Sequence, residues 1–243
     1  MKIEMIRPVG EIAVEFPQSI LVFKEKGIDY CCGGQRTLQE ACQSAGVMVS
    51  EVVKSLEGIE PAQGPDLSVQ WNSLHDLIAH ILKKHHVFTK SQLNLLVELS
   101  AKVFRVHGAN HAELDAVDKL VRTMAEELGH HMAKEEQIAF PYLVSLEEVA
   151  QGKRSQDLLF SYEVFKSQPQ HCLTTEHEET GEQLRQLRKI TGGFEPPAGA
   201  CVSYRAFYRA LKELEEDIHQ HIHLENNVLF PMAERLAGVG SAR

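Results

Sequence analysis

The feature that most constrains this chain is an eleven-residue pattern that occurs twice, 90 residues apart. Each copy begins with a histidine, has a glutamate four positions later and ends in Phe-Pro. The copies run from His131 to Pro141 and from His221 to Pro231. A lone His-x-x-x-Glu pair is weak evidence, because about 1.4 such pairs are expected by chance, whereas the full pattern is expected only about 0.002 times. The repeat therefore indicates two copies of one helical unit, each with a histidine and a glutamate on one face.

Two further histidines precede the repeats at nearly equal distances. His86 lies 45 residues before His131, and His177 lies 44 residues before His221. We therefore expect two helical hairpins, each of which contributes one histidine from its first helix and a His-Glu pair from its second. His85 is the alternative to His86, because it fits the apolar stripe of its helix at least as well, although its spacing of 46 residues matches less closely.

Apolar residues recur at helical spacing through most of the chain, which predicts an all-α fold. Residues 71–237 predict a bundle of four long helices, with a long and partly helical crossover at 147–170. Residues 1–60 predict a small helical domain, in which Thr37 and Ser50 are suited to helix N-caps. Residues 58–66 contain two prolines and two glycines, and predict the linker between the domains.

The repeated residues have the chemistry of a centre with two metal ions. Residues four apart lie on one side of a helix, so the imidazoles and carboxylates can converge inside the bundle. If both glutamates bridge, each ion receives two nitrogens and two oxygens, and an oxo or hydroxo bridge leaves one position open for a small ligand. This donor set, which lacks thiolate, favours two non-haem iron ions, with manganese or a mixed centre as alternatives. The expected ligands are His86, His131, Glu135, His177, His221 and Glu225.

Other polar residues lie beside the expected ligands along the chain. Glu127 and Glu176 are placed to orient a ligand or to relay protons, although a solvated helix surface would explain them equally well. His219 and His223 each lie two residues from His221, which turns them away from the ligand face of the helix. We therefore expect these two histidines to lie in solvent.

The composition excludes several classes of protein. The chain has 243 residues and a formal net charge of −9, with scattered basic residues, so we expect no nucleic-acid partner. No apolar run approaches the roughly 20 residues that cross a bilayer, and the N-terminus does not resemble a signal peptide, so we expect a cytoplasmic protein without a membrane partner. The five cysteines include no C-x-x-C pair and fit neither a disulfide framework nor a thiolate zinc site.

The motifs together resemble a known family, the Repair of Iron Centres proteins of the YtfE and ScdA type, over nearly the whole chain. The matching segments are 29–34, which contains adjacent Cys31 and Cys32, and 126–141, 175–178 and 221–231. The resemblance implies a hemerythrin-like four-helix bundle with a di-iron centre, preceded by a small helical domain that carries the cysteine pair. It also supports His86 over His85 and implies a homodimer in some members. This chain departs from the family in its longer crossover at 147–170.

The same resemblance implies a function in the nitrosative and oxidative stress response. Proteins of this type repair damaged iron-sulfur clusters, by donating iron or by removing nitric oxide, so iron-sulfur proteins would be clients and nitric oxide or oxygen the small ligands. Cys31 and Cys32 would then hand over iron or undergo thiol chemistry. Two alternatives stay open: an enzyme that reduces nitric oxide to nitrous oxide, and a hemerythrin-like sensor or carrier of oxygen or nitric oxide.

Overall fold

The computed structural model describes residues 3–59, 71–155 and 161–240, and within these ranges every named element is a helix. The all-α prediction is therefore confirmed. The N-terminal part contains α1 (Val9–Glu15), α2 (Ser19–Glu25), α3 (Leu38–Ala45) and α4 (Val49–Glu57). Of the predicted linker at 58–66, only residues 58 and 59 lie within the described ranges.

The N-terminal helices are short, and local capping fixes two of their boundaries. Thr37 caps α3 as predicted: its side chain accepts a hydrogen bond from the Glu40 backbone, and the Glu40 side chain accepts one from the backbone of Thr37. The prediction for Ser50 is wrong, because α4 already begins at Val49 and Met48 occupies the N-cap position. Without a polar cap, α4 depends on the packing of its buried residues.

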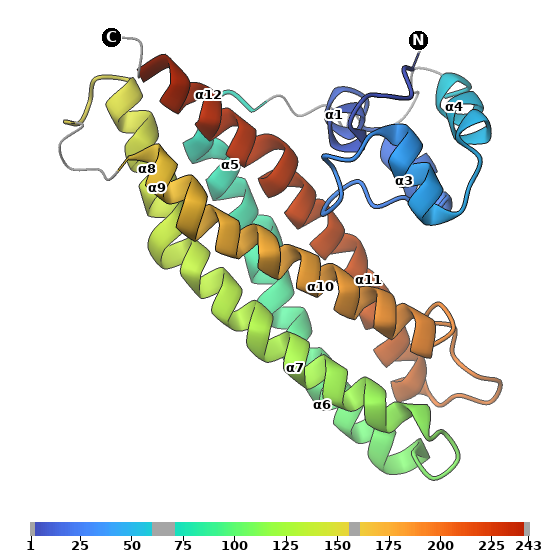
Figure 1. Cartoon of the computed structure of the whole chain (residues 1–243). Coiled ribbons are helices and arrows are strands. Elements are labelled where there is room, and N and C mark those ends of the chain that lie inside the picture. Colours follow the sequence, from blue (N-terminus) through green and yellow to red (C-terminus); the bar gives the residue numbers. More distant parts are fainter. Residues whose placement is uncertain (1–2, 60–70, 156–160, 241–243) are drawn as a thin grey trace.

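The remainder of the chain forms four long rods, each made of consecutive helical segments, and Figure 1 shows them running alongside one another as an elongated bundle. The first rod comprises α5 (Leu74–His80), η1 (Ile81–His86) and α6 (Val87–His107), and the second comprises α7 (Glu113–Lys134), η2 (Glu135–Ala139) and α8 (Phe140–Ala150). The third comprises α9 (Tyr162–Phe165), η4 (Lys166–Gln170) and α10 (His171–Ile190), and the fourth comprises α11 (Val202–Leu224), η5 (Glu225–Leu229) and α12 (Phe230–Gly240).

Each rod contains one π-helical segment, which explains the Phe-Pro ending of the repeated pattern. Proline has no backbone N–H and cannot continue an α-helical hydrogen-bond ladder. Pro141 and Pro231 each come second in the α-helix that follows a π segment, where the change in hydrogen bonding accommodates them. Glu135 and Glu225 are the first residues of these π segments, so each proline marks a local widening of the rod beside a glutamate.

The predicted crossover at 147–170 belongs largely to the rods. Helix α8 continues to Ala150, and α9 already begins at Tyr162, while residues 156–160 lie outside the described ranges. Buried Glu147 holds the end of α8 in place, because its two carboxylate oxygens accept hydrogen bonds from the backbone N–H groups of Leu74 and His75 at 2.9 and 3.1 Å. These contacts tie the second rod to the start of the first.

The apolar core is divided into two clusters along the bundle. One cluster contains residues 93–103 of the first rod and 204–222 of the fourth, and it continues into the N-terminal helices. The other contains residues 74–81 and 224–233, at the opposite end of the same rods. The expected metal ligands lie where the two clusters meet along each rod, so a polar layer interrupts the apolar core at this level.

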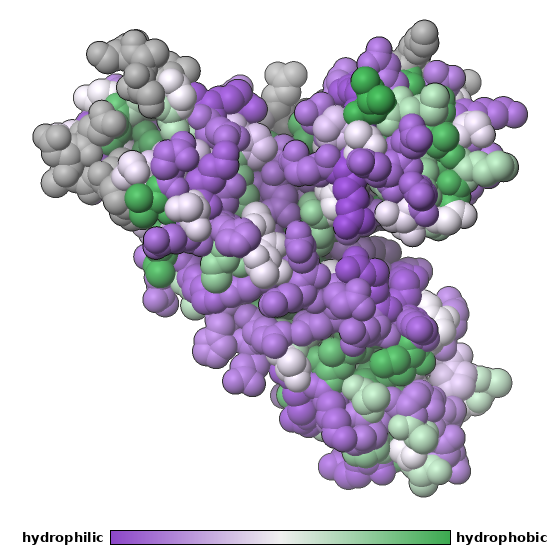
Figure 2. All heavy atoms as spheres, in the orientation of Figure 1, coloured by the Kyte–Doolittle hydropathy of each residue, from purple (hydrophilic) through white to green (hydrophobic). Residues whose placement is uncertain are grey.

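The N-terminal helices pack against one side of the bundle. Helix α1 contacts η5 of the fourth rod, and Figure 1 places the blue N-terminal part beside the orange and red helices α10 to α12. The face shown in Figure 2 is mainly hydrophilic, with small separate hydrophobic areas on the N-terminal part and the bundle. Among the described residues, no helix combines the length and apolar character that a membrane crossing requires.

Candidate metal centre

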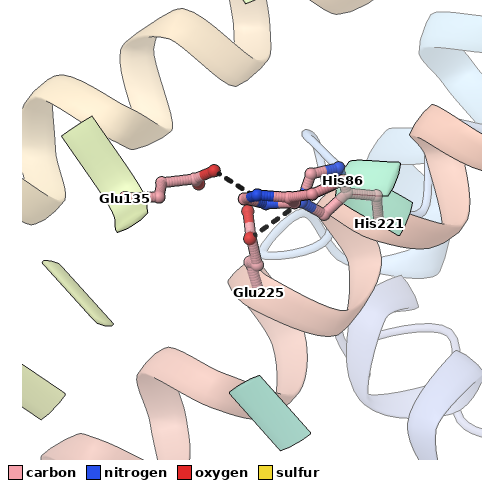
Figure 3. A group of neighbouring side chains, drawn as sticks. All are labelled: His86, Glu135, His221 and Glu225. Carbon is pink, nitrogen blue, oxygen red and sulfur yellow. Dashed lines mark hydrogen bonds and ion pairs between the residues drawn. The ribbon is translucent and has the colours of Figure 1, made fainter. Parts of the chain in front are cut away.

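Six polar side chains converge at one level of the bundle, between the two apolar clusters. The first rod contributes His86, the second His131 and Glu135, the third His177, and the fourth His221 and Glu225. All six are at most 3% exposed. Figure 3 shows Glu135 reaching from its own rod toward Glu225 and the imidazoles of His86 and His221. The structure therefore brings together all six residues that the sequence repeat singled out.

The donor atoms form two groups that share both glutamates. The first group is His86, His221, Glu135 and Glu225, and the second is His131, His177, Glu135 and Glu225. Within each group, one donor atom from each residue lies within 4.8 Å of the other three. Each group thus offers two imidazole nitrogens and two carboxylate oxygens to one ion.

The two oxygens of each glutamate point to different groups. In Glu135, Oε1 lies 3.1 Å from Nε2 of His131, and Oε2 lies 3.3 Å from Nε2 of His86. In Glu225, Oε1 lies 3.0 Å from Nε2 of His221, and Oε2 lies 3.0 Å from Nε2 of His177. This is the arrangement that two bridging carboxylates need in order to hold a pair of metal ions.

Several buried atoms in this layer lack the partners that such burial normally requires. His86 Nε2 and both carboxylate oxygens of Glu135 have no hydrogen-bond partner among the described residues. In addition, Nε2 of His131 lies 3.0 Å from Nε2 of His177. Each of these rings has a hydrogen-bond acceptor at Nδ1, so in the neutral form each directs an Nε2 lone pair inward. Buried carboxylates and inward lone pairs both require cations, so the residues fit a di-metal centre.

Without metal, protons would have to supply this positive charge. Burial by itself lowers the pKa of His177, but the close carboxylates of Glu135 and Glu225 outweigh it and raise the pKa to about 10. Burial by itself raises the pKa of Glu135, but the charge of His131 and the close imidazoles of His177 and His86 hold it well below its ordinary value. Metal ions binding here would therefore displace protons from the imidazoles.

The outward-facing nitrogens of three imidazoles are held by a second layer of side chains. Glu136 Oε1 accepts from His86 Nδ1 at 2.7 Å, and Glu176 Oε2 accepts from His131 Nδ1 at 2.9 Å. Each of these carboxylates also pairs with a lysine, Lys90 for Glu136 and Lys134 for Glu176. Such partners fix the tautomer and orientation of a metal-binding histidine and raise its basicity.

The third outer partner is an amide from the fourth rod. Asn226 Oδ1 accepts from His177 Nδ1 at 3.0 Å. For Glu176, the sequence-based role as a partner of a ligand agrees with this geometry and stays a proposal. Glu127 instead accepts a hydrogen bond from Gln183 and lies at the mouth of a cavity beside His131.

His85, the alternative to His86, is fully buried but belongs to neither donor group. Its Nδ1 lies 2.9 Å from Asp217 Oδ1, and its ring stacks on that of His221, with centroids 5.6 Å apart and planes inclined by 11°. The geometry therefore places His86 among the donors and makes His85 a packing neighbour of a donor.

The prediction that His223 lies in solvent is wrong, because the N-terminal helices cover it. The His223 ring is 4% exposed, contacts the ring of Tyr30 edge-on at 5.4 Å, and lies 3.1 Å from the Asn227 amide. Burial lowers its pKa to about 4, so the ring is neutral at pH 7. His219 is partly buried, which also lowers its pKa. The helical wheel turned both rings away from the ligands, but it could not show a second domain on that side.

The adjacent cysteines lie in a loop that contacts the backbone of His177, one of the candidate metal ligands. Cys32 Sγ donates to the carbonyl oxygen of His177 at 3.3 Å. Asp29 Oδ1 accepts from the backbone N–H groups of Cys31 and Cys32 at 3.2 and 3.0 Å. Both thiols are free, with their sulfurs 3.8 Å apart. Donor atoms of Asp29, Cys31 and Cys32 also lie within 4.8 Å of one another, a third group that could hold an ion.

A cavity of about 490 Å³ opens beside the centre between the second and third rods. It is lined by His131, Lys134, Glu176 and Thr180, with Glu127 among the further lining residues. Because His131 is a member of the second donor group, the cavity borders one metal position, although the donors themselves are at most 3% exposed.

The sequence analysis missed three polar residues that shape the surroundings of the centre. Glu136, Asn226 and Asn227 directly follow the two glutamates of the repeat, and all three have structural partners. A usable signal was present, because both copies continue with polar residues after the glutamate, Glu-Gln in the first and Asn-Asn in the second. A periodicity argument treats these as surface positions because they turn away from the ligand face.

Sequence comparisons agree with this geometry. Residues 77–233 match the model of the hemerythrin HHE cation binding domain, and residues 6–60 match a family described as a domain of unknown function (DUF542). The iron-sulfur cluster repair protein YtfE of Escherichia coli O1:K1 is 35% identical over 96% of this chain and 97% of its own length. The iron-sulfur cluster repair protein ScdA of Staphylococcus haemolyticus is 31% identical over 91% of this chain and 95% of its own. The two donor groups, the helical N-terminal part and these matches together show that the chain belongs to the hemerythrin-like YtfE/ScdA family of iron-sulfur cluster repair proteins.

Proposed function

We propose that this chain repairs damaged iron-sulfur clusters by supplying iron from a di-iron centre, and that Cys31 and Cys32 receive the iron as it leaves. The main support for this proposal is the contact between the Cys32 thiol and the carbonyl of His177. It places two thiols, which are soft ligands, beside the backbone of the imidazole and carboxylate site. The names of the relatives support the repair function.

The chemistry of the two sites suits a hand-over. The di-metal ligands are imidazole and carboxylate groups, which hold iron firmly at neutral pH, while the cysteine loop offers two thiols and one carboxylate. Hydrogen bonding to Cys32 and burial raise the pKa of Cys31 well above its ordinary value, so this thiol is protonated until a metal ion displaces the proton. When a ferrous ion moves to the loop, the protons released by the thiols can pass to the vacated imidazoles, and no electron is transferred.

The decisive experiment uses the full chain loaded with isotopically labelled iron. We expect it to restore activity to an iron-sulfur enzyme damaged by nitric oxide, with the label recovered in the repaired cluster. Replacing both Cys31 and Cys32 by Ser should leave the di-iron centre loaded but reduce the rate of label transfer at least about tenfold. A repaired cluster without label, or equal transfer by the Ser variant, would contradict the proposal.

The identity of the metal is part of the same proposal. Mixed imidazole and carboxylate ligation suits iron, and manganese is the alternative. Metal analysis and Mössbauer spectroscopy of protein purified without oxygen should show a coupled pair of iron ions. If the manganese content is equal to or greater than the iron content and the protein is fully active in repair, the resident metal of the centre is manganese and not iron.

The cavity at His131 favours a second candidate function, the reduction of nitric oxide. It would let a small molecule reach the position held by His131 and His177 without passing the N-terminal helices. Two nitric oxide molecules would then take two electrons from the reduced centre and two protons, yielding nitrous oxide and water. Single-turnover gas analysis of the reduced protein would detect nitrous oxide if this candidate is correct, and its absence would exclude it.

We further propose that the protein acts in the cytoplasm under nitrosative or oxidative stress, with iron-sulfur proteins as clients and with a homodimer as the assembled form. The net charge of −9 and the mainly hydrophilic face in Figure 2 are compatible with this setting. Strains that lack the protein should lose activity of iron-sulfur enzymes after exposure to nitric oxide, and recover it when the gene is restored. Light scattering of the purified chain tests the dimer.

A further inference from the structure

The two hairpins place equivalent residues around the centre, and two of the equivalent pairs differ in a way that bears on iron release. His86 in the first hairpin corresponds to His177 in the second, because each is the lone histidine of its hairpin. The neighbouring positions correspond likewise: Glu136 to Asn226, and Lys90 to Gly181.

In the first hairpin, the outer partner of the histidine is a carboxylate that faces two donors. Glu136 Oε1 accepts from His86 Nδ1 at 2.7 Å and from Lys90 Nζ at 2.6 Å. A carboxylate suits this position, because both partners are N–H groups and an ionised carboxylate only accepts.

In the second hairpin, the outer partner faces one donor and one acceptor. Asn226 Oδ1 accepts from His177 Nδ1 at 3.0 Å, while Asn226 Nδ2 donates to the carbonyl of Cys31 at 3.3 Å. Only a side chain with both a donor and an acceptor makes these two bonds. The replacement of carboxylate by amide therefore links the cysteine loop to one imidazole of the centre.

The difference between Lys90 and Gly181 also favours contact of the cysteine loop with the second hairpin. Lys90 covers the outer carboxylate of the first hairpin, but a Cβ atom at Gly181 would lie 3.1 Å from Cys32 Sγ. The missing side chain leaves room for the thiol to reach the His177 carbonyl at 3.3 Å. Asn227 also holds the cysteine loop, because its side-chain amide donates a hydrogen bond to the carbonyl of Tyr30 at 3.1 Å.

We propose that the cysteine loop exchanges iron with one metal position only, that of His131 and His177, and that Asn226 is the positioning residue that couples the loop to it. This inference rests on the proposed iron delivery and adds which ion leaves and which residue controls its exit. The position of His86 and His221 has Glu136 and Lys90 outside it instead, and so keeps its ion.

The coupling can be measured without any client. Because linkage is reciprocal, a loop that responds to the metal position must show a Cys32 reactivity that depends on metal loading. In the wild-type chain, we expect loading with iron to change the rate of thiol labelling at Cys32 at least about fivefold. Asn226→Asp keeps the acceptor for His177 but loses the donor for Cys31, so the labelling rate should become independent of loading.

The matched control is Glu136→Gln, which makes the opposite exchange at the equivalent position of the first hairpin. It should retain the dependence of Cys32 labelling on loading. Gly181→Lys, which copies the residue of the first hairpin, should abolish the dependence without altering any hydrogen bond to an imidazole. Loss of the dependence in Glu136→Gln, or its persistence in both Asn226→Asp and Gly181→Lys, would overturn the coupling.

A second measurement tests the selectivity for one position. Release of ferrous iron from the loaded full chain to a coloured chelator should occur in two phases, each with one iron per chain. Asn226→Asp and Gly181→Lys should slow the fast phase about tenfold and leave the slow phase within about twofold, whereas Glu136→Gln should alter only the slow phase. A single phase in the wild type, or equal changes in both phases, would contradict the inference. Failure of label transfer to a cluster, with these results intact, would count against the proposed function alone.

Discussion

The two hairpins of the bundle share their inner side chains and differ in their outer ones. Inside, each supplies two imidazoles and one carboxylate, so each donor group receives one imidazole from each hairpin. Outside, Glu136 of the first hairpin pairs with Lys90, whereas Asn226 and Asn227 of the second bind the backbone of the cysteine loop. The comparison teaches that the shared centre fixes the inner positions, while the outer positions specialise according to what packs against them.

The same contrast appears along the second and fourth rods. Gly129 and Ala133 precede Glu135 and lie at the surface or at the cavity, where a Cβ added to Gly129 would meet nothing within 4 Å. The equivalent residues of the fourth rod are His219 and His223, which lie on the side that the N-terminal helices cover. At these positions the second rod is therefore open to solvent or to the cavity, whereas in the fourth rod the ring of Tyr30 from the N-terminal part covers His223.

The largest effect should follow from removing a shared carboxylate. Glu135→Leu and Glu225→Leu each delete a ligand of both positions, so each should lose at least one of the two ions while helix content stays largely intact. Metal analysis and circular dichroism measure the two quantities. Glu126→Leu, at an exposed position of the second rod, is the matched control and should keep both ions. Full metal content in either variant would show that the replaced glutamate is not a shared ligand, so the two hairpins would not contribute equally to the centre.

The neighbouring histidines of the first rod allow a sharper test. His86→Phe should lose iron from the position of the first donor group, whereas His85→Phe should retain both ions, because His85 belongs to neither donor group and contacts Asp217 and the ring of His221 instead. Metal analysis and the absorption spectrum of the loaded protein report the difference. Greater iron loss in the His85 variant would show that His85 is the ligand. His85, and not His86, would then be the counterpart of His177 in the first hairpin.

A change in the N-terminal part should affect the second hairpin alone. A side chain at Gly34 would overlap the Asn227 side chain and approach the Tyr30 carbonyl, so Gly34→Val should cost about 1–3 kcal/mol and loosen the cysteine loop. We expect faster thiol labelling of Cys32 and unchanged iron content. Gly46→Ala, in the same part but with open space around it, serves as a control for strain at a glycine with positive φ. An unchanged labelling rate in Gly34→Val would show that the position of the cysteine loop does not depend on Asn227.

The stability of the metal-free protein should fall as the pH rises above 7. The pKa of His177 is raised to about 10, so its ion pairs contribute fully below the unfolded-state pKa of about 6.5 and are lost as the pH rises through 10. With metal bound, the imidazole carries no proton to lose. The melting temperature of the metal-free protein should therefore decrease between pH 7 and 10 more than that of the loaded protein. Parallel curves would show that the charges of the centre are compensated in another way.

The smallest effect is expected at the open surface of the first hairpin. Gly129 lies in the middle of α7 with free space around it, so Gly129→Ala should stabilise the protein by about 0.5–1 kcal/mol through helix propensity. Chemical denaturation of the loaded protein measures the gain. A loss of stability would mean that this surface of α7 is covered in the assembled protein, as its counterpart in the fourth rod is.

Most of the fold and all six candidate ligands could be predicted from the sequence. The helical period gave the all-α class, and the repeated His-x-x-x-Glu pattern with its Phe-Pro ending located four donors. The lone histidines then followed from the hairpin spacing. The structure brings these six residues together because a helix converts sequence spacing directly into direction. The capping box at Thr37 was also readable, since it involves only residues three positions apart.

Other features depended on contacts that spacing does not encode. Sequence periodicity assigned His223 to the surface and gave no role to Asn226. In the structure the N-terminal part lies there: Tyr30 contacts His223, and the Cys31 carbonyl accepts from Asn226. The crossover at 147–170 was predicted as partly helical, but spacing did not show that α8 continues to Ala150 or that the third rod begins at Tyr162. Ser50 had the chemistry of an N-cap, but the packing of α4 set its beginning at Val49.

The sequence by itself determined the donor set, because a metal ion demands particular atoms and a helix delivers them at fixed intervals. The tertiary structure alone decided that each carboxylate points one oxygen to each group, and that the cysteine loop sits on His177 and not on His86. The physical reason is that both outcomes depend on how separate elements approach one another. A difference as small as Gly181 for Lys90 decides which side can be approached.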